Sequence, residues 1–233
     1  SALQVVLASR AAIGSGAAPL DLAAPSVLAG AATGVHLRNA ANGSRAVVTS
    51  EAGEIDYQQQ LGNLEVGAIF GTQRVRLEAS AGAILDADAL DGSEAAEADV
   101  TGDVLELVSR DGIGSRATSA GALEIDVRVV SGEVRASGDI AVETRGAAAL
   151  GDLSIGTLRA SAVELRTQGR LLDDADDEDT DIAAETAVLR AGSEIGGADI
   201  EEPADISLDL DVEQLDALLT QDGSIDVALA RGG

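Results

Sequence analysis

Apolar and polar residues alternate in short segments along the whole chain. Alternation with a period of two predicts strands that bury one face. A helical face can be drawn through Val212, Leu215, Leu218 and Leu219, but the alternation that precedes it favours a strand there. We therefore predict an all-β chain. The clearest alternating groups are Val35/Leu37, Ile55/Tyr57, Val75/Leu77, Leu105/Leu107, Ile140/Val142, Ile206/Leu208/Leu210/Val212 and Ile225/Val227/Leu229.

Two sequence words recur in the same order along the chain. The first, Ile-Gly-Ser at 13–15, returns at 113–115 and, as Ile-Gly-Gly, at 195–197. The second, LGNLEVG at 61–67, returns as LGDLSIG at 150–156. Each copy of the second word is followed by an alternating strand, a glycine and an acidic loop. Such recurrence is typical of a repeat protein.

The words divide the chain into about two and a third copies of one unit, at residues 1–112, 113–194 and 195–233. Each unit must hold several coils, because glycine, asparagine, aspartate and serine turns separate its strands. The chain begins and ends in the middle of a unit. We therefore expect a single continuous solenoid segment of a longer protein, open at both ends.

The composition limits the width of the core. One Tyr, one Phe and no Trp leave only Leu, Val, Ile and Ala to fill it, and these pack well in thin stacked layers. With 27 Gly and 3 Pro, the corners are expected to be made by glycine. These features favour a right-handed parallel β-helix with irregular coils over an antiparallel sandwich, which usually has a core tryptophan.

The alternation also predicts which side chains face the interior. One set is expected to point inward and to stack on like residues of neighbouring coils, and a second set to point outward. The inward set is Leu77, Leu107, Val142, Leu165, Leu208 and Ile225, and the outward set is Arg76, Glu106, Glu143 and Glu164.

Three strand words resemble the repeat regions of giant filamentous-haemagglutinin-like bacterial surface adhesins. They are GAILD at 82–86, GRLLD at 169–173 and, after the Ile-Gly word, PLDL at 19–22. The resemblance covers nearly the whole chain, although the second unit has no Pro at the place of Pro19. It implies an extracellular β-helix shaft on the bacterial cell surface, with roles in attachment, biofilm or filament assembly. The implied partners are neighbouring repeats and other copies in a filament.

The charge narrows the choice of partners. The formal net charge is −26, with 41 acidic and 15 basic residues, so the surface repels nucleic acid and anionic membranes. No apolar run approaches the roughly 18 residues that cross a bilayer, so membrane insertion is not expected. Acidity of this kind also keeps a repetitive β protein soluble.

Few residues are suited to catalysis. The chain has no Cys and one histidine, His36, which is expected at the surface. The usual pairs of nucleophile and base cannot be assembled from this inventory, so we predict that the protein is not an enzyme. Carboxylate pairs remain as an alternative, because polysaccharide-cleaving β-helices use acidic residues, but such clefts generally also hold aromatic residues.

Two acidic loops are the chemically distinctive segments. Residues 173–181 hold seven carboxylates in nine positions, and the corresponding loop of the first unit is sparser. Solvated loops are one explanation, and Ca²⁺ binding is the other, because Ca²⁺ takes carboxylate ligands. A cation- or glycan-binding module is therefore the alternative function, and no other cofactor is predicted. The candidate ligands are Asp86, Asp88, Asp91, Asp173, Asp174 and Asp176.

Overall fold

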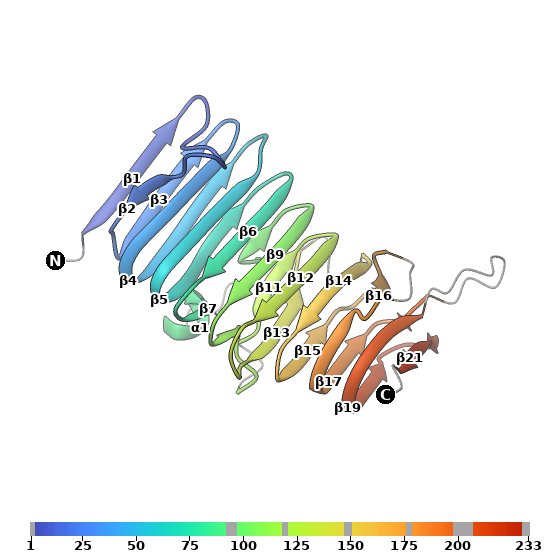
Figure 1. Ribbon diagram of the computed structural model, residues 1–233. Helices are drawn as coiled ribbons and strands as arrows, with labels where there is room; N and C mark the ends of the chain where they lie inside the picture. The colour runs from blue at the N-terminus through green and yellow to red at the C-terminus, as the bar shows by residue number, and fades with distance from the viewer. Residues whose placement is uncertain are drawn as a thin grey trace.

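The strands form a stack of coils along one axis, from the N-terminal to the C-terminal end (Figure 1). This computed structural model describes residues 3–91, 97–117, 121–146, 151–175, 179–197 and 207–229. The stack has about nine turns, and all ladders between its named strands are parallel. The predicted class, an all-β parallel β-helix, is confirmed.

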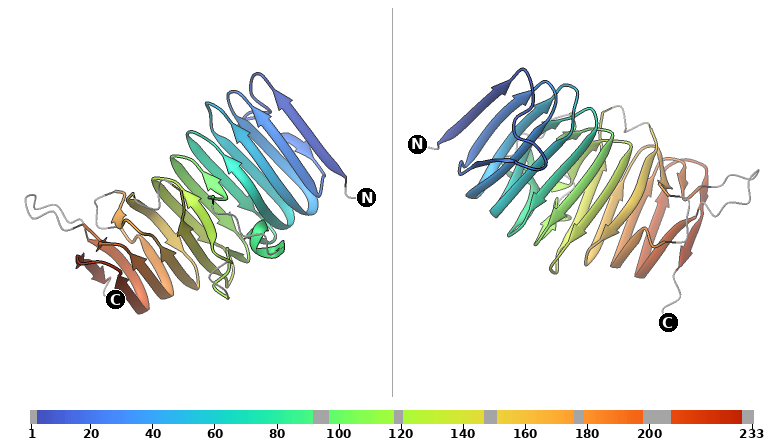
Figure 2. Two further views of the ribbon diagram at one scale, coloured as in Figure 1. Left: turned by 180° about the vertical axis from the view of Figure 1, so that it is seen from behind. Right: turned by 45° about the horizontal axis from the view of Figure 1, so that its top comes forward.

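Strands account for nearly all of the regular structure. Residues 212–219 lie in a strand, as the alternation predicts, whereas residues 87–91, expected in a loop, form a short helix that projects from the side of the stack (Figure 2). The elements are β1 (Gln4–Ser9), β2 (Leu20–Leu22), β3 (Ser26–Ala31), β4 (Val35–Ser50), β5 (Ile55–Phe70), β6 (Arg74–Ala79), β7 (Ala83–Asp86), α1 (Ala87–Asp91), β8 (Val100–Thr101), β9 (Val104–Ser109), β10 (Gly112–Ile113), β11 (Leu123–Asp126), β12 (Val129–Val134), β13 (Asp139–Thr144), β14 (Leu153–Arg159), β15 (Ala162–Arg166), β16 (Arg170–Asp173), β17 (Ile182–Ala191), β18 (Glu194–Ile195), β19 (Leu208–Leu219), β20 (Ser224–Ile225) and β21 (Val227–Leu229).

The core consists of columns of aliphatic side chains that run along the stack. One column passes through Val35, Ile55, Val75, Leu105 and Val130, which are register partners in successive coils. Each of these side chains is at most 1% exposed. Burying a side chain of this size contributes roughly 1.5–3 kcal/mol. Each coil thus adds one aliphatic side chain to the column. Such columns fill the narrow interior that the composition predicts.

The predicted inward set is buried with one exception. Leu77, Leu107, Val142, Leu165 and Leu208 are buried. Ile225 stacks on the buried Ile195 as predicted, but it is 45% exposed. In the described part of the chain β20 pairs with β18 on one side only, and no second coil covers Ile225. The outward set behaves as predicted, since Arg76, Glu106, Glu143 and Glu164 are half-buried in ion pairs on the outer surface.

A polar cluster accommodates the single tyrosine within the stack. The Tyr57 side chain is fully buried, and its hydroxyl accepts a hydrogen bond from Asn39 Nδ2 at 3.1 Å and lies 3.0 Å from Ser44 Oγ. Ser44 in turn donates to Gln59 Oε1 at 2.6 Å. Burial raises the pKa of Tyr57, and the two side-chain hydrogen bonds act against that rise. The long strands β4 and β5 are therefore joined by side chains as well as by backbone.

The recurring Ile-Gly word marks a corner where coils approach closely. Gly14, Gly114 and Gly196 have φ values of +69°, +63° and +72°, which favour glycine. A Cβ atom at these positions would lie 2.4, 2.2 and 1.9 Å from a carbonyl oxygen of the next coil. The Ile-Gly word recurs because the residue at each of these corners must adopt a left-handed backbone conformation and must have no side chain.

We predict that Leu165→Asp destabilises the protein by at least about 4 kcal/mol, because it places an unpaired carboxylate between Val142 and Leu189 in a buried aliphatic column. Leu61→Asp is the matched control, because Leu61 is 50% exposed, and it should cost less than about 1 kcal/mol. Urea denaturation followed by circular dichroism measures both. Equal losses in the two variants would contradict the inward register.

We further predict that Gly114→Ala costs about 3 kcal/mol, because alanine is strained at this φ and its Cβ meets Ala141 O. Gly30→Ala serves as the control, since nothing lies within 4 Å of a Cβ there, and it should stay within about 1 kcal/mol of the wild type. A Gly114→Ala protein as stable as Gly30→Ala would show that the corner does not require glycine. Thermal and urea unfolding report both values.

Candidate functional site

The first acidic loop is ordered where it leaves β7. The Asp86 carboxylate accepts hydrogen bonds from Asp88 N at 2.7 Å and Ala89 N at 2.9 Å, so it caps the first turn of α1. Asp88 forms an ion pair with Arg45 at 3.1 Å. Asp91 ends the helix, and its side chain lies outside the described residues. These predicted ligands therefore engage a helix terminus and an arginine.

The second acidic loop distributes its carboxylates in the same way. Asp173 accepts a hydrogen bond from Ala175 N at 2.9 Å, and Asp174 pairs with Arg128 at 3.4 Å. Asp176 lies outside the described residues. Among the residues that the structure describes, no three of the six predicted ligands converge on one point. Binding of Ca²⁺ by these loops stays a prediction from the sequence.

The structure brings Asp86 together with two acids that the sequence did not single out. Oxygen atoms of Asp86, Asp99 and Glu124 lie within 4.8 Å of one another, and the three residues are 2%, 4% and 3% exposed. They come from the end of β7, the residue before β8, and β11 of the next coil. We call this group the first carboxylate triad. Arg145 forms an ion pair with this group, since its Nη2 lies 3.3 Å from Glu124 Oε1.

Three like charges in so small a volume cannot all be ionised without cost. The pKa of Asp99 is raised to about 7. Burial is the largest cause, hydrogen bonds with the side chain and backbone of Glu124 oppose the rise, and the charges of Asp86 and Asp88 add to it. The triad is closed to solvent and to any large substrate.

In the second unit Asp181 takes the place of Asp99, because Ile182 pairs with Leu210 as Val100 pairs with Ile125. Asp173 and Asp209 lie beside it, but they are only half-buried, and the three carboxylates do not converge as those of the first triad do. The pKa of Asp181 is raised to about 7. Burial is the largest cause, the Asp209 backbone hydrogen bond opposes the rise, and the charges of Asp173 and Asp209 and the Asp173 side-chain hydrogen bond add to it.

One sequence pattern points to Asp99 and Asp181, although alternation alone does not single them out. In each unit an aspartate and a β-branched residue, Asp99-Val100 and Asp181-Ile182, follow the acidic loop. In the strand register, Glu124 of the first pairing takes the same place as Asp209 of the second. The sequence words Ile125-Asp126-Val127 and Leu208-Asp209-Leu210 suggest a correspondence that differs from this one by two positions. The loops also differ in length, so the sequence words did not indicate which acids would meet.

The single histidine is buried, not at the surface as expected. His36 is 7% exposed, and its Nε2 lies 3.6 Å from Glu54 Oε1. No hydrogen-bond partner of His36 Nδ1 lies among the described residues. The corner at Gly14 covers the strand here, because His36 N donates to Ile13 O at 2.8 Å. His36 is therefore part of a packed corner and does not face a cleft.

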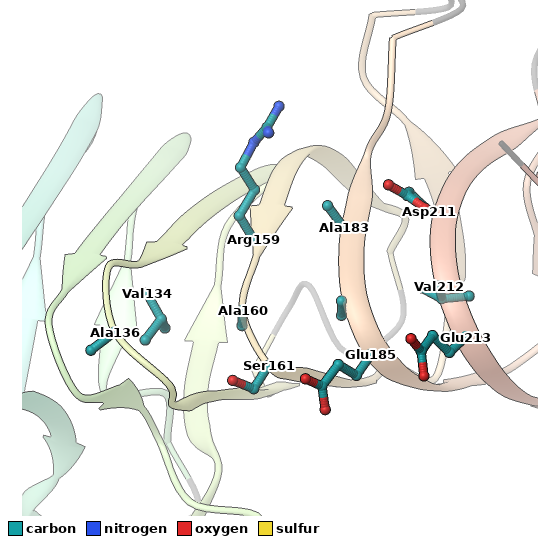
Figure 3. A pocket seen from close by; sticks show the side chains of 11 residues that line it. Val134, Ala136, Arg159, Ala160, Ser161, Ala183, Glu185, Asp211, Val212 and Glu213 are labelled. Atoms are coloured by element: carbon teal, nitrogen blue, oxygen red, sulfur yellow. The ribbon is translucent and has the colours of Figure 1, made fainter. Parts of the chain in front are cut away.

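An open groove of about 710 Å³ crosses β12, β14, β17 and β19 (Figure 3). Its charged residues are all exposed to water, and Arg159 points away from the carboxylates of Glu185 and Glu213. No aromatic residue lines it. The groove thus lacks both the buried acid and the aromatic platform that a polysaccharide cleft generally provides. Its lining residues are Val134, Ala136, Arg159, Ala160, Ser161, Ala183, Ala184, Glu185, Asp211, Val212 and Glu213.

No protein-family model matches the chain, and no curated protein or solved structure matches it either. Within the described residues, no helix is long and apolar enough to cross a membrane. The fold and the site together define a parallel β-solenoid with a buried carboxylate triad of Asp86, Asp99 and Glu124.

We predict that Arg145→Gln destabilises the protein by about 2–3 kcal/mol at neutral pH, because Glu124 would lose its ion pair with Arg145 while it lies beside two other buried acids. Arg128→Gln is the matched control. Arg128 is 57% exposed on the side chain and pairs with the exposed Asp103, so its loss should cost less than about 1 kcal/mol. Urea denaturation measures the difference, and equal costs would contradict the dependence of the triad on Arg145.

Proposed function

We propose that the chain is a structural shaft or filament segment of a secreted bacterial surface adhesin, acting in attachment, biofilm or filament assembly. The observation that carries the proposal is the single hydrophobic core that runs through the stack from Ile13 to Leu210. A solenoid of this kind transmits force along its axis and sets the distance between whatever it joins. The repeated sequence words and their resemblance to adhesin repeats support the same role.

The outer surface favours a load-bearing segment. Arginine side chains bridge carboxylates on neighbouring coils, for example Arg74 with Glu106 through two bonds of 2.6 Å and Arg170 with Asp152 at 2.5 and 2.8 Å. The geometry is bidentate, which adds orientation to charge pairing. The partners proposed for such a segment are neighbouring repeats and other copies of the chain, whereas the net charge of −26 opposes binding to nucleic acid.

We propose no catalytic role for the segment. The two acids whose pKa is raised, Asp99 and Asp181, are buried, and the acids in the groove of Figure 3 are exposed. General acid catalysis of glycoside hydrolysis needs a polarised carboxyl group that a sugar can reach. The carboxyl groups with a raised pKa and the carboxyl groups that a sugar could reach lie at different places in the molecule. This separation supports a scaffold over an enzyme.

The test is carried out on cells of the source organism. Antibodies raised against the chain should label intact cells, and an allele carrying Leu165→Asp should reduce attachment or biofilm as much as deletion of the segment, because it disrupts the core. The matched Leu61→Asp allele should behave as wild type. Labelling that requires permeabilised cells would contradict the surface location, and wild-type attachment after deletion would contradict the adhesive role.

A further inference from the structure

The core columns finish on exposed aliphatic side chains at both ends of the described stack. One column can be followed through register partners without a break, from Leu20 of β2 to Leu229 of β21. Its inner members are buried, whereas Leu20 is 40% exposed and Leu229 is 59% exposed. The two ends of one column therefore have the same chemistry. The column consists of Leu20, Leu37, Tyr57, Leu77, Leu107, Gly132, Leu158, Ile182, Leu210 and Leu229.

The other strands of the end coils are open in the same way. We call the coil of β1 and β2 the first coil, and the coil of residues 214–219, β20 and β21 the last coil; they lie at opposite ends of the stack (Figure 1). Within the described ranges, β1 pairs only with β3, and residues 214–219 of β19 pair only with β17. Leu7 and Leu219, on these two strands, are only partly buried against the core.

The open strands of the two end coils match each other in position and direction. β1 and residues 214–219 belong to one continuous parallel ladder, which passes through β3, β4, β5, β8, β11, β13, β15 and β17. Each end thus presents an aliphatic interior and an open strand edge, and an open edge is a template to which another strand can add.

Charge is distributed very unevenly along the stack. Residues 1–50, which include β1 to β4, contain three arginines and one acid, whereas residues 184–233 contain two arginines and twelve acids. The formal charges are +2 and −10. Arg10 is exposed next to β1, and Asp222 and Asp226 are exposed on the last coil. Two C-terminal ends therefore repel each other strongly, whereas an N-terminal and a C-terminal end attract.

The net charge of −26 does not prevent such an approach at physiological salt. The screening length is then roughly 8 Å, and successive coils lie roughly 4.8 Å apart. An approaching copy therefore feels mainly the charges of the one or two coils nearest to it. These charges are complementary only for unlike ends.

We propose that the first and last coils form a head-to-tail contact between two copies of this chain. β1 of one copy lies parallel to residues 214–219 of the other, and Leu20 covers Leu229, so the core columns continue from copy to copy. The contact removes the exposed aliphatic side chains from water, which favours association. Because it joins two different surfaces, it leaves an open end on each side and adds copies in series along the axis. The inference rests on the proposed function, since it specifies the contact that a filament of such segments needs.

Two variants, each blocked at one end, test the contact with purified chain in about 0.15 M salt. Leu20→Asp places a carboxylate at the first coil, and Leu229→Asp places one at the last coil; each should weaken association at least about tenfold, because the contact would bury an unpaired charge. In sedimentation velocity the wild type should form a series of species that grows with concentration, and each variant alone should stay monomeric. Mixed in equal amounts, the variants should form a 1:1 dimer and nothing larger, because one working end remains on each copy.

The control is Leu61→Asp, whose leucine is equally exposed but lies at the turn within β5, away from the end coils, and it should associate like the wild type. Circular dichroism checks that each variant keeps the wild-type fold. A wild type that stays monomeric up to about 1 mM would overturn the proposal without any variant. A dimer of Leu229→Asp alone would show that two N-terminal ends join, and wild-type association of both variants would place the contact elsewhere; either result would overturn the head-to-tail contact. These measurements need no cells, so their failure is distinguished from a failure of attachment.

Discussion

Backbone hydrogen bonds between successive coils fix the spacing of the stack, and the rest of the structure depends on that spacing. Parallel strands lie roughly 4.8 Å apart, so a residue in one coil is always close to its register partner in the next. Aliphatic columns fit this repeat. Corners fit it only where a side chain is absent, because a Cβ at Gly14, Gly114 or Gly196 would overlap a carbonyl oxygen of the following coil.

The same spacing brings charged side chains of neighbouring coils close together, and their charges are compensated differently on the surface and in the interior. Outside, arginines bridge carboxylates of neighbouring coils, as Arg74 does with Glu106, and water screens what remains. Inside, the three acids of the first carboxylate triad are removed from water. Burial therefore raises the pKa values of Asp99 and Asp181, whereas hydrogen bonds from arginines lower those of Glu106 and Asp152 on the surface.

The proposed shaft role depends on contacts between neighbouring coils, because these contacts hold a solenoid together. At two places an aspartate side chain adds to the backbone ladder: Glu124 N donates to Asp99 Oδ2, and Asp209 N donates to Asp181 Oδ2. Each of these hydrogen bonds ties one coil to the next.

Much of the fold could be predicted from the sequence, because its main interactions are local and periodic. Alternation identified the strands, the lack of large aromatic residues indicated a narrow core, and recurring Ile-Gly words located corners that only glycine can form. The burial of Leu77, Leu107 and Leu165 follows from period two alone. The resemblance to adhesin repeats and the predicted Ca²⁺ ligands remain predictions.

The tertiary structure decided what the acidic residues do. Asp86 is 13 residues from Asp99 and 38 from Glu124 in the sequence, and loops of unequal length lie between the coils that unite them. Alternation cannot reveal which coil stacks on which, so the sequence presented Asp86, Asp88 and Asp91 as one group. In the fold Asp88 turns to Arg45 and Asp86 to Asp99, and His36 is buried at a corner. Pairing between coils depends on register across the stack, and register is set by the whole fold.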